Sequence, residues 1–196
     1  MCEFDMVRKV SYNNQMHREY PPLSWQHIQK PSLFVHKGTC LGSSVANGVN
    51  LLIDRITLTG DMVDRAARIG PFPIRNERGI RIALNKLEQQ IGSGITINRS
   101  SDSLEELRLA SKDHPVLLPV NFKEWHRVLA GRSVRVGNFE KVKRVLRTDH
   151  LILVYDHKSR GDLNSVFDIN AEDGYSAPRQ MLEDIASEVF FLSRQR

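Results

Sequence analysis

The chain has 196 residues, of which 40% are hydrophobic and 26% charged, and its formal net charge is +5. This length suits a domain with a real core, and the composition is ordinary for a globular protein. No apolar run approaches the roughly 20 residues that span a bilayer, and the polar N-terminus lacks the apolar region of a secretory signal. Two cysteines, Cys2 and Cys40, do not make a disulfide framework, and they favour a reducing, cytosolic working environment.

The first half of the chain is predicted to be mainly helical. Residues 1–22 form a polar arm, and residues 23–196 form one domain. A helix is expected to begin near Cys40, because the apolar residues after it recur with a 3.6-residue period. These residues are Val45, Val49, Leu52, Ile53 and Ile56. Residues 60–70 and 80–92 are predicted helices with a loop over 70–79 between them, and a further helix over 103–112 starts with a capping box at Ser103 and Glu106.

The second half is predicted to be mainly β-structure. The segments 114–120, 149–157 and 165–170 indicate strands, and the turn over 158–164 joins the last two as an antiparallel hairpin. A short helix over 179–189, with Met181, Leu182, Ile185 and Val189 facing inward, precedes a closing strand over 190–194. Helices followed by strands predict an α+β fold rather than an alternating βαβ one.

Cys40 lies in the segment GTCLGSSVANGVNLL, at the start of the predicted helix. Helix N-termini lower the pKa of a thiol through unpaired N–H groups and the positive end of the helix dipole. The small residues after it, among them Gly42 and Ser44, permit close approach of another layer and leave space above the thiol. Taken alone, this pattern fits a buried, inert cysteine equally well.

A base and its orienting acid are predicted in the hairpin. His150 opens the strand HLILVYDH, and Asp168 lies in VFDIN on the strand expected to pair with it. An imidazole at a strand start can face a cleft, and a nearby carboxylate would fix its tautomer. Individually, His150 fits a structural histidine and Asp168 an ordinary turn acid. The order of cysteine, histidine and acid is more specific than any one of them.

Together these segments resemble papain-like cysteine peptidases. Within that superfamily they are most similar to the YopT-type bacterial effector proteases, and next to the leader-peptide-cleaving domains of bacteriocin exporters. The resemblance covers about 15 residues at Cys40 and about 25 around the hairpin. It implies a papain-like α+β fold with a Cys40–His150–Asp168 triad, a protein substrate, a host protein for the effector type, and export into a host cell.

The sequence departs from the papain pattern at the oxyanion donor. That family usually carries Gln or Asn five or six residues before the cysteine, where this chain has Val35 and Phe34. The side chains expected to replace this oxyanion donor are those of Gln29, Gln26 or His36, and the backbone N–H of Cys40 is a further candidate donor.

Other functions stay open at this point. Deamidation of a glutamine or transfer to an amine would use the same triad, and a papain-like fold can serve binding alone. A basic run over residues 127–147 suggests contact with an anionic surface, with nucleic acid a less favoured partner. No cofactor or metal is predicted, because the seven histidines are scattered without metal-site spacing.

Overall fold

The computed structural model describes residues 27–28, 32–69, 72–73, 77–92, 94–120, 150–158, 162–169, 174–186 and 188–195. The predicted arm over residues 1–22 and the basic run over 127–147 lie outside these residues. The division into an arm and one catalytic domain therefore stays a prediction.

The centre of the protein is a seven-stranded sheet in which all the neighbouring strands are antiparallel. The strand order is β1-β8-β7-β6-β5-β9-β4. The strands are β1 (His27–Ile28), β4 (Ile95–Ser100), β5 (Val116–Val120), β6 (His150–Lys158), β7 (Leu163–Phe167), β8 (Gly174–Pro178) and β9 (Val189–Arg194). A separate two-stranded hairpin joins β2 (Arg68–Ile69) and β3 (Phe72–Pro73).

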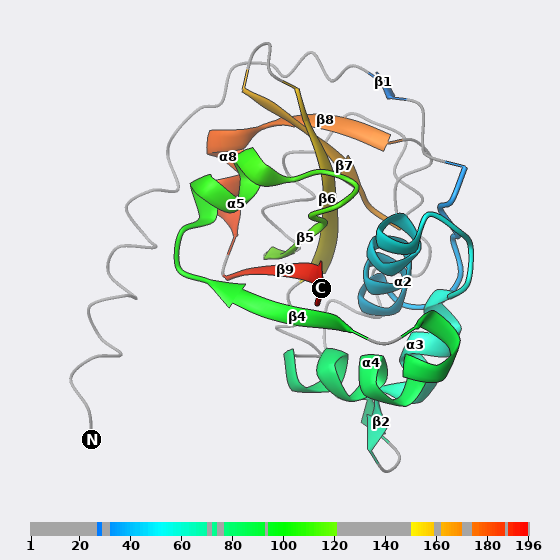
Figure 1. Cartoon of the computed structure of the whole chain (residues 1–196). Coiled ribbons are helices and arrows are strands. Elements are labelled where there is room, and N and C mark those ends of the chain that lie inside the picture. Colours follow the sequence, from blue (N-terminus) through cyan, green and yellow to red (C-terminus); the bar gives the residue numbers. More distant parts are fainter. Residues whose placement is uncertain are drawn as a thin grey trace, which may run out of the picture.

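Helices cover both faces of the sheet, as Figure 1 shows. They are α2 (Cys40–Ile53), α3 (Gly60–Ala66), α4 (Glu77–Ile91), α5 (Ser103–Leu109) and α8 (Arg179–Ile185). The larger buried cluster packs α2, α3 and α4 against one face, and the smaller one packs α5 and α8 against the other. The predicted α+β arrangement is therefore confirmed, with the cysteine helix in the N-terminal helical half.

Helix α2 is an interior helix with definite ends. Thr39 caps its start by accepting a hydrogen bond from Gly42, and Asp54 ends it in the left-handed conformation. Every residue from Leu41 to Leu51 is buried, so the helix is enclosed on all sides rather than along one apolar stripe. Ile56, predicted to continue that stripe, lies beyond the helix end and is 56% exposed.

The small residues of α2 serve packing. A side chain at Gly42 would overlap the backbone of Gly60 and the carboxylate of Asp64, and one at Gly48 would press on Leu192. Other protein layers therefore occupy the room that these residues provide. Close approach was expected, but the idea that this stretch leaves open space above the thiol is wrong for the buried residues from Leu41 onward.

Several predicted element boundaries differ from the structure. Helix α4 begins at Glu77, inside the segment predicted as a loop, and α5 is capped by Asp102 rather than by Ser103. Val189, predicted to close a helix, begins β9, because the chain is already extended at Ala186. Strands β4 and β8 were not predicted.

Candidate active site

Cys40 is the first residue of α2, where a thiol meets a helix N-terminus. The residue is partly exposed, whereas the helix behind it is buried. Cys40 is therefore the least buried residue of the predicted group. This placement agrees with the helix start predicted near Cys40.

His150 begins β6, and its Cα is paired in register with Val120 at the end of β5. The imidazole is only 3% exposed. A buried imidazole needs partners for its two ring nitrogens. One partner directly follows the next strand and the other comes from α2.

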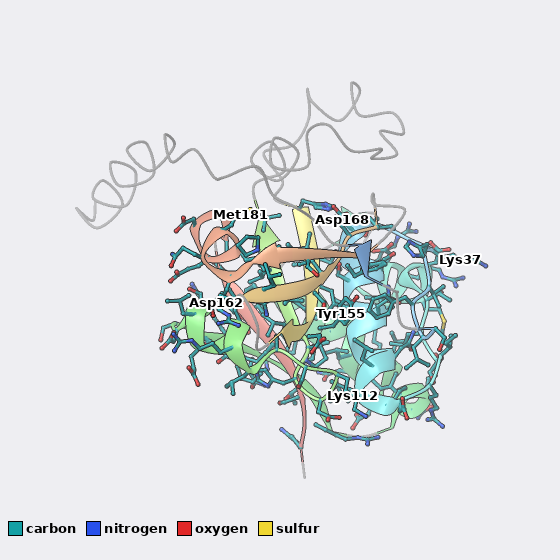
Figure 2. The ribbon with its side chains drawn as sticks, turned by 90° about the horizontal axis from the view of Figure 1, so that it is seen from above. Lys37, Lys112, Tyr155, Asp162, Asp168 and Met181 are labelled. Carbon is teal, nitrogen blue, oxygen red and sulfur yellow. The ribbon has the colours of Figure 1, made fainter. Side chains whose placement is uncertain are left out.

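The first partner is Asp168, which directly follows β7 rather than lying on the strand as predicted, and its carboxylate is 1% exposed. The Nε2–H group of His150 donates to Asp168 Oδ1 over 2.7 Å. Leu153 faces Phe167 in the hairpin, so continuing that register places Asp168 diagonally opposite His150, within side-chain reach. Figure 2 shows Asp168 and Asp162 at opposite ends of β7, with Asp168 at the end of the strand nearest this site.

The partner from α2 is the Cys40 thiol, which is hydrogen-bonded to the His150 ring. Since Asp168 occupies Nε2, the ring nitrogen left for sulfur is Nδ1. The structure thus brings Cys40, His150 and Asp168 into one connected chain. Two elements far apart in sequence, the helix and the hairpin, supply its members.

The charges of this group shift two pKa values in opposite directions. Burial raises the pKa of Cys40, but the hydrogen bond and charge of His150, with the backbone of Leu151, hold it below its ordinary value. Burial lowers the pKa of His150, but the charge and hydrogen bond of Asp168, together with Cys40, raise it to about 10. A thiolate beside an imidazolium is the arrangement that these opposite shifts favour.

The backbone of Leu151 links β6 directly to α2. Its N–H group donates to the Cys40 sulfur, and its carbonyl accepts a 3.0 Å hydrogen bond from Ser44 Oγ. Cys40 and Ser44 are one helical turn apart, so the helix is held at two points along the strand. Sequence reasoning missed this contact, because a backbone donor has no side-chain signature.

Of the three side chains predicted as oxyanion donors, the structure describes only His36. Gln26 and Gln29 lie outside the described residues. The exposed His36 ring lies 5.0 Å from the ring of Phe167. Phe34 packs edge-on against Phe167, and the backbone of Val35 is bonded to Asn47, so neither offers a side-chain donor.

No group of three or more His, Cys, Asp or Glu side chains that could hold a metal occurs among the described residues. Within that same part of the chain, no helix is long and apolar enough to cross a membrane. The sequence prediction of a metal-free site stays a prediction.

The comparisons with known proteins were made on both sequence and structure. No protein-family model matches the sequence, and no curated protein matches it. A solved structure from Bacillus anthracis, described as that of a candidate C39-like peptidase, superposes with a TM-score of 0.51 at 9% identity. The match covers 80% of this chain and 88% of that one. At this identity the likeness concerns the fold, and the chain accordingly has a papain-like fold, with a helical N-terminal half packed on a C-terminal antiparallel sheet.

Proposed function

We propose that the protein is a thiol-dependent acyl-transfer enzyme, and specifically a cysteine peptidase acting on a protein substrate. One observation carries this proposal. The thiol of the partly exposed residue Cys40 bonds to His150, whose other ring nitrogen bonds to the buried carboxylate of Asp168. The likeness in fold to a candidate C39-like peptidase supports the same reading.

Each member of the group has a defined role in the proposed reaction. The Cys40 thiolate attacks the peptide carbonyl carbon, a C–S bond forms, and the carbonyl electrons move onto oxygen. When the intermediate collapses, the C–N bond breaks and the His150 imidazolium gives its proton to the leaving amine. His150 then takes a proton from water, which attacks the thioester and releases the acid and the thiolate.

Asp168 acts through His150 in this scheme. Its carboxylate fixes the ring so that Nδ1 faces sulfur, and it stabilises the imidazolium charge. Because the Asp168 and His150 side chains are almost fully buried, water screens their interaction little. The finer assignment to YopT-type effectors, with a host substrate and export into a host, rests on the sequence segments alone and stays a prediction.

The test is the pH dependence of Cys40 alkylation by iodoacetamide in the Cys2→Ser background. We expect a midpoint below the ordinary 9.0 of a thiol, and a shift back toward it in His150→Ala. His114→Ala is the matched control, because that imidazole bonds instead to Glu106 and should leave the midpoint unchanged.

A slow reaction with an ordinary midpoint in both the parent and His150→Ala would contradict the proposal. It would make Cys40 a structural residue and direct attention to the basic run over 127–147. Salt-dependent binding that ignores Cys40→Ala would then be the expected property of that run.

A further inference from the structure

Asp64 of α3 holds the turn that leads into Cys40. Its Oδ2 accepts the Thr39 N–H over 2.7 Å, and its Oδ1 accepts the Thr39 hydroxyl over 2.6 Å. The same hydroxyl oxygen accepts the Gly42 N–H over 3.2 Å. One carboxylate therefore fixes both the backbone and the side chain of the residue before the thiol.

Close backbone packing keeps Asp64 in this position. A side chain at Gly60, the first residue of α3, would overlap the Lys37 carbonyl and the backbone of Ser43. One at Gly42 would overlap Gly60 and the Asp64 carboxylate itself. Helix α3 thus lies directly against the start of α2, and this packing holds the Asp64 carboxylate beside Thr39.

These contacts determine which backbone N–H groups at the start of α2 remain without a hydrogen-bond acceptor. The first N–H groups of a helix have no partner within it. Asp64 accepts the Thr39 N–H, and the Thr39 hydroxyl oxygen accepts the Gly42 N–H. The hydrogen bonds found among the described residues use neither the Cys40 N–H nor the Leu41 N–H. Both of these groups belong to the turn that carries the sulfur.

Resting on the function proposed above, we propose that Asp64 is a positioning residue for acyl transfer. It holds Thr39 so that the N–H groups of Cys40 and Leu41 stay unpaired and aimed at the oxygen of the carbonyl that sulfur attacks. Fixed donors of this kind stabilise the developing oxyanion without reorganising. The clamp also supplies an oxyanion site that needs no glutamine before the cysteine.

The test compares two reactions of the same thiol in the Cys2→Ser protein. With p-nitrophenyl acetate the Cys40 thiolate attacks the ester carbonyl carbon, a thioester forms, the C–O bond breaks and p-nitrophenolate leaves, after passing through an oxyanion. Iodoacetamide reacts by displacement of iodide at a saturated carbon, where no oxyanion forms. The ratio of the two rate constants therefore isolates the oxyanion donors from thiol reactivity.

We expect Asp64→Ala to lower this ratio about tenfold. This is a smaller loss than the roughly 10²–10³-fold fall in rate that follows removal of an oxyanion donor itself. Asp64→Asn, which keeps an oxygen for the Thr39 N–H, should recover most of the loss. Asp61→Asn is the matched control, because it removes a negative charge from the same helix and should leave the ratio unchanged. The iodoacetamide midpoint should stay in place, since His150, Leu151 and Asp168 are the groups that set the thiol pKa.

Thr39→Val and Thr39→Ser give an independent test if Asp64→Ala does not fold. The valine removes the clamped hydroxyl and should lower the ratio, and the serine should restore it. An unchanged ratio in folded Asp64→Ala or Thr39→Val, or an equal fall in both rates, would overturn the positioning role. Failure of the proposed function is a separate result: the unsubstituted thiol would then show an ordinary midpoint and no release of p-nitrophenolate.

Discussion

At the scale of single residues, the site depends on how Asp168 compensates the burial of His150. A buried imidazole alone would stay neutral, because desolvation disfavours its charged form. The adjacent carboxylate reverses this preference and raises the pKa of His150 to about 10. The retained proton is what the proposed mechanism later gives to the leaving amine.

The pH dependence of stability provides a first prediction. Between pH 6.5 and 9.0, the ordinary values of the two groups, the unfolded pair is a neutral imidazole and a thiol. Above the lowered pKa of Cys40, the folded thiolate–imidazolium pair holds the same number of protons, so in that part of the window the free energy of unfolding should not vary with pH through this pair. In Cys40→Ser only His150 titrates, and its folded pKa lies above its unfolded one. Stability from His150 is then fully present below pH 6.5 and is lost as pH rises, by up to about 1.4 kcal/mol per unit.

Urea unfolding at several pH values within this window checks the prediction. Asp168→Asn in the Cys40→Ser protein is the control, because it removes the main group that raises the pKa of His150 and should flatten the profile. A flat profile in Cys40→Ser with Asp168 intact would show that His150 is not charged in the folded protein.

Residue patterns predicted the members of the site but not their supports. Cys40, His150 and Asp168 occur at a helix start, at a strand start and directly after a paired strand, and each of these positions has a local signal. Asp64 lies 25 residues from Thr39, and Ser44 lies 107 residues from Leu151. No local pattern records such contacts, since only the packing of α2 against α3 and β6 creates them.

At the scale of elements, α2 is anchored to the loops around it by buried asparagines. Asn50 Oδ1 accepts the N–H groups of Thr57 and Leu58, and its Nδ2 donates to the Leu58 carbonyl. Asn47 bonds the backbone of Val35 in a similar way. Both asparagines inside this buried helix are therefore satisfied by backbone groups of the flanking segments.

We expect Asn50→Ala to lower the free energy of unfolding by about 3 kcal/mol or more. The substitution leaves the buried N–H and carbonyl of Leu58 and the part-buried N–H of Thr57 unpaired, at roughly 1–3 kcal/mol for each buried group. Asn85→Ala, at an exposed position of α4, should change stability by no more than about 0.5 kcal/mol. Urea denaturation of both variants measures the difference, and equal values would mean that the Asn50 bonds contribute nothing net.

The elements that sequence predicted best are those with strong periodicity. Strand β6 is a continuous apolar run, and α2 and α4 show clear helical spacing. Strand β4 alternates buried Ile95 and Ile97 with half-exposed Thr96 and Asn98, a pattern that was present but not used. Strand β8, GYSAP, is short and carries a glycine and a proline, so only its pairing with β7 and β1 defines it.

At the scale of the whole molecule, the proposed active site joins two layers. Cys40 begins α2 in the helical layer, whereas His150 begins β6 of the sheet and Asp168 directly follows β7; Figure 1 shows α2 beside β6 and β7. The distance between thiol and imidazole is therefore set by how α2 packs on β6. Ser44 lies at that contact and is fully buried, with its hydroxyl bonded to the Leu151 carbonyl.

Enlarging Ser44 should separate the two layers and so uncouple the thiol from its base. Ser44→Val adds bulk at a filled contact and removes the bond to Leu151, which we expect to push α2 from the strand and cost about 1–3 kcal/mol of stability. The iodoacetamide midpoint of Cys40 should then rise toward 9.0, because His150 and the Leu151 N–H are the groups that lower it. Ser44→Ala is the matched control, since it loses the same hydroxyl without adding bulk and should keep the midpoint near that of the parent. If valine and alanine shift the midpoint equally, the Ser44 hydrogen bond rather than the spacing of the layers sets the reactivity of the thiol.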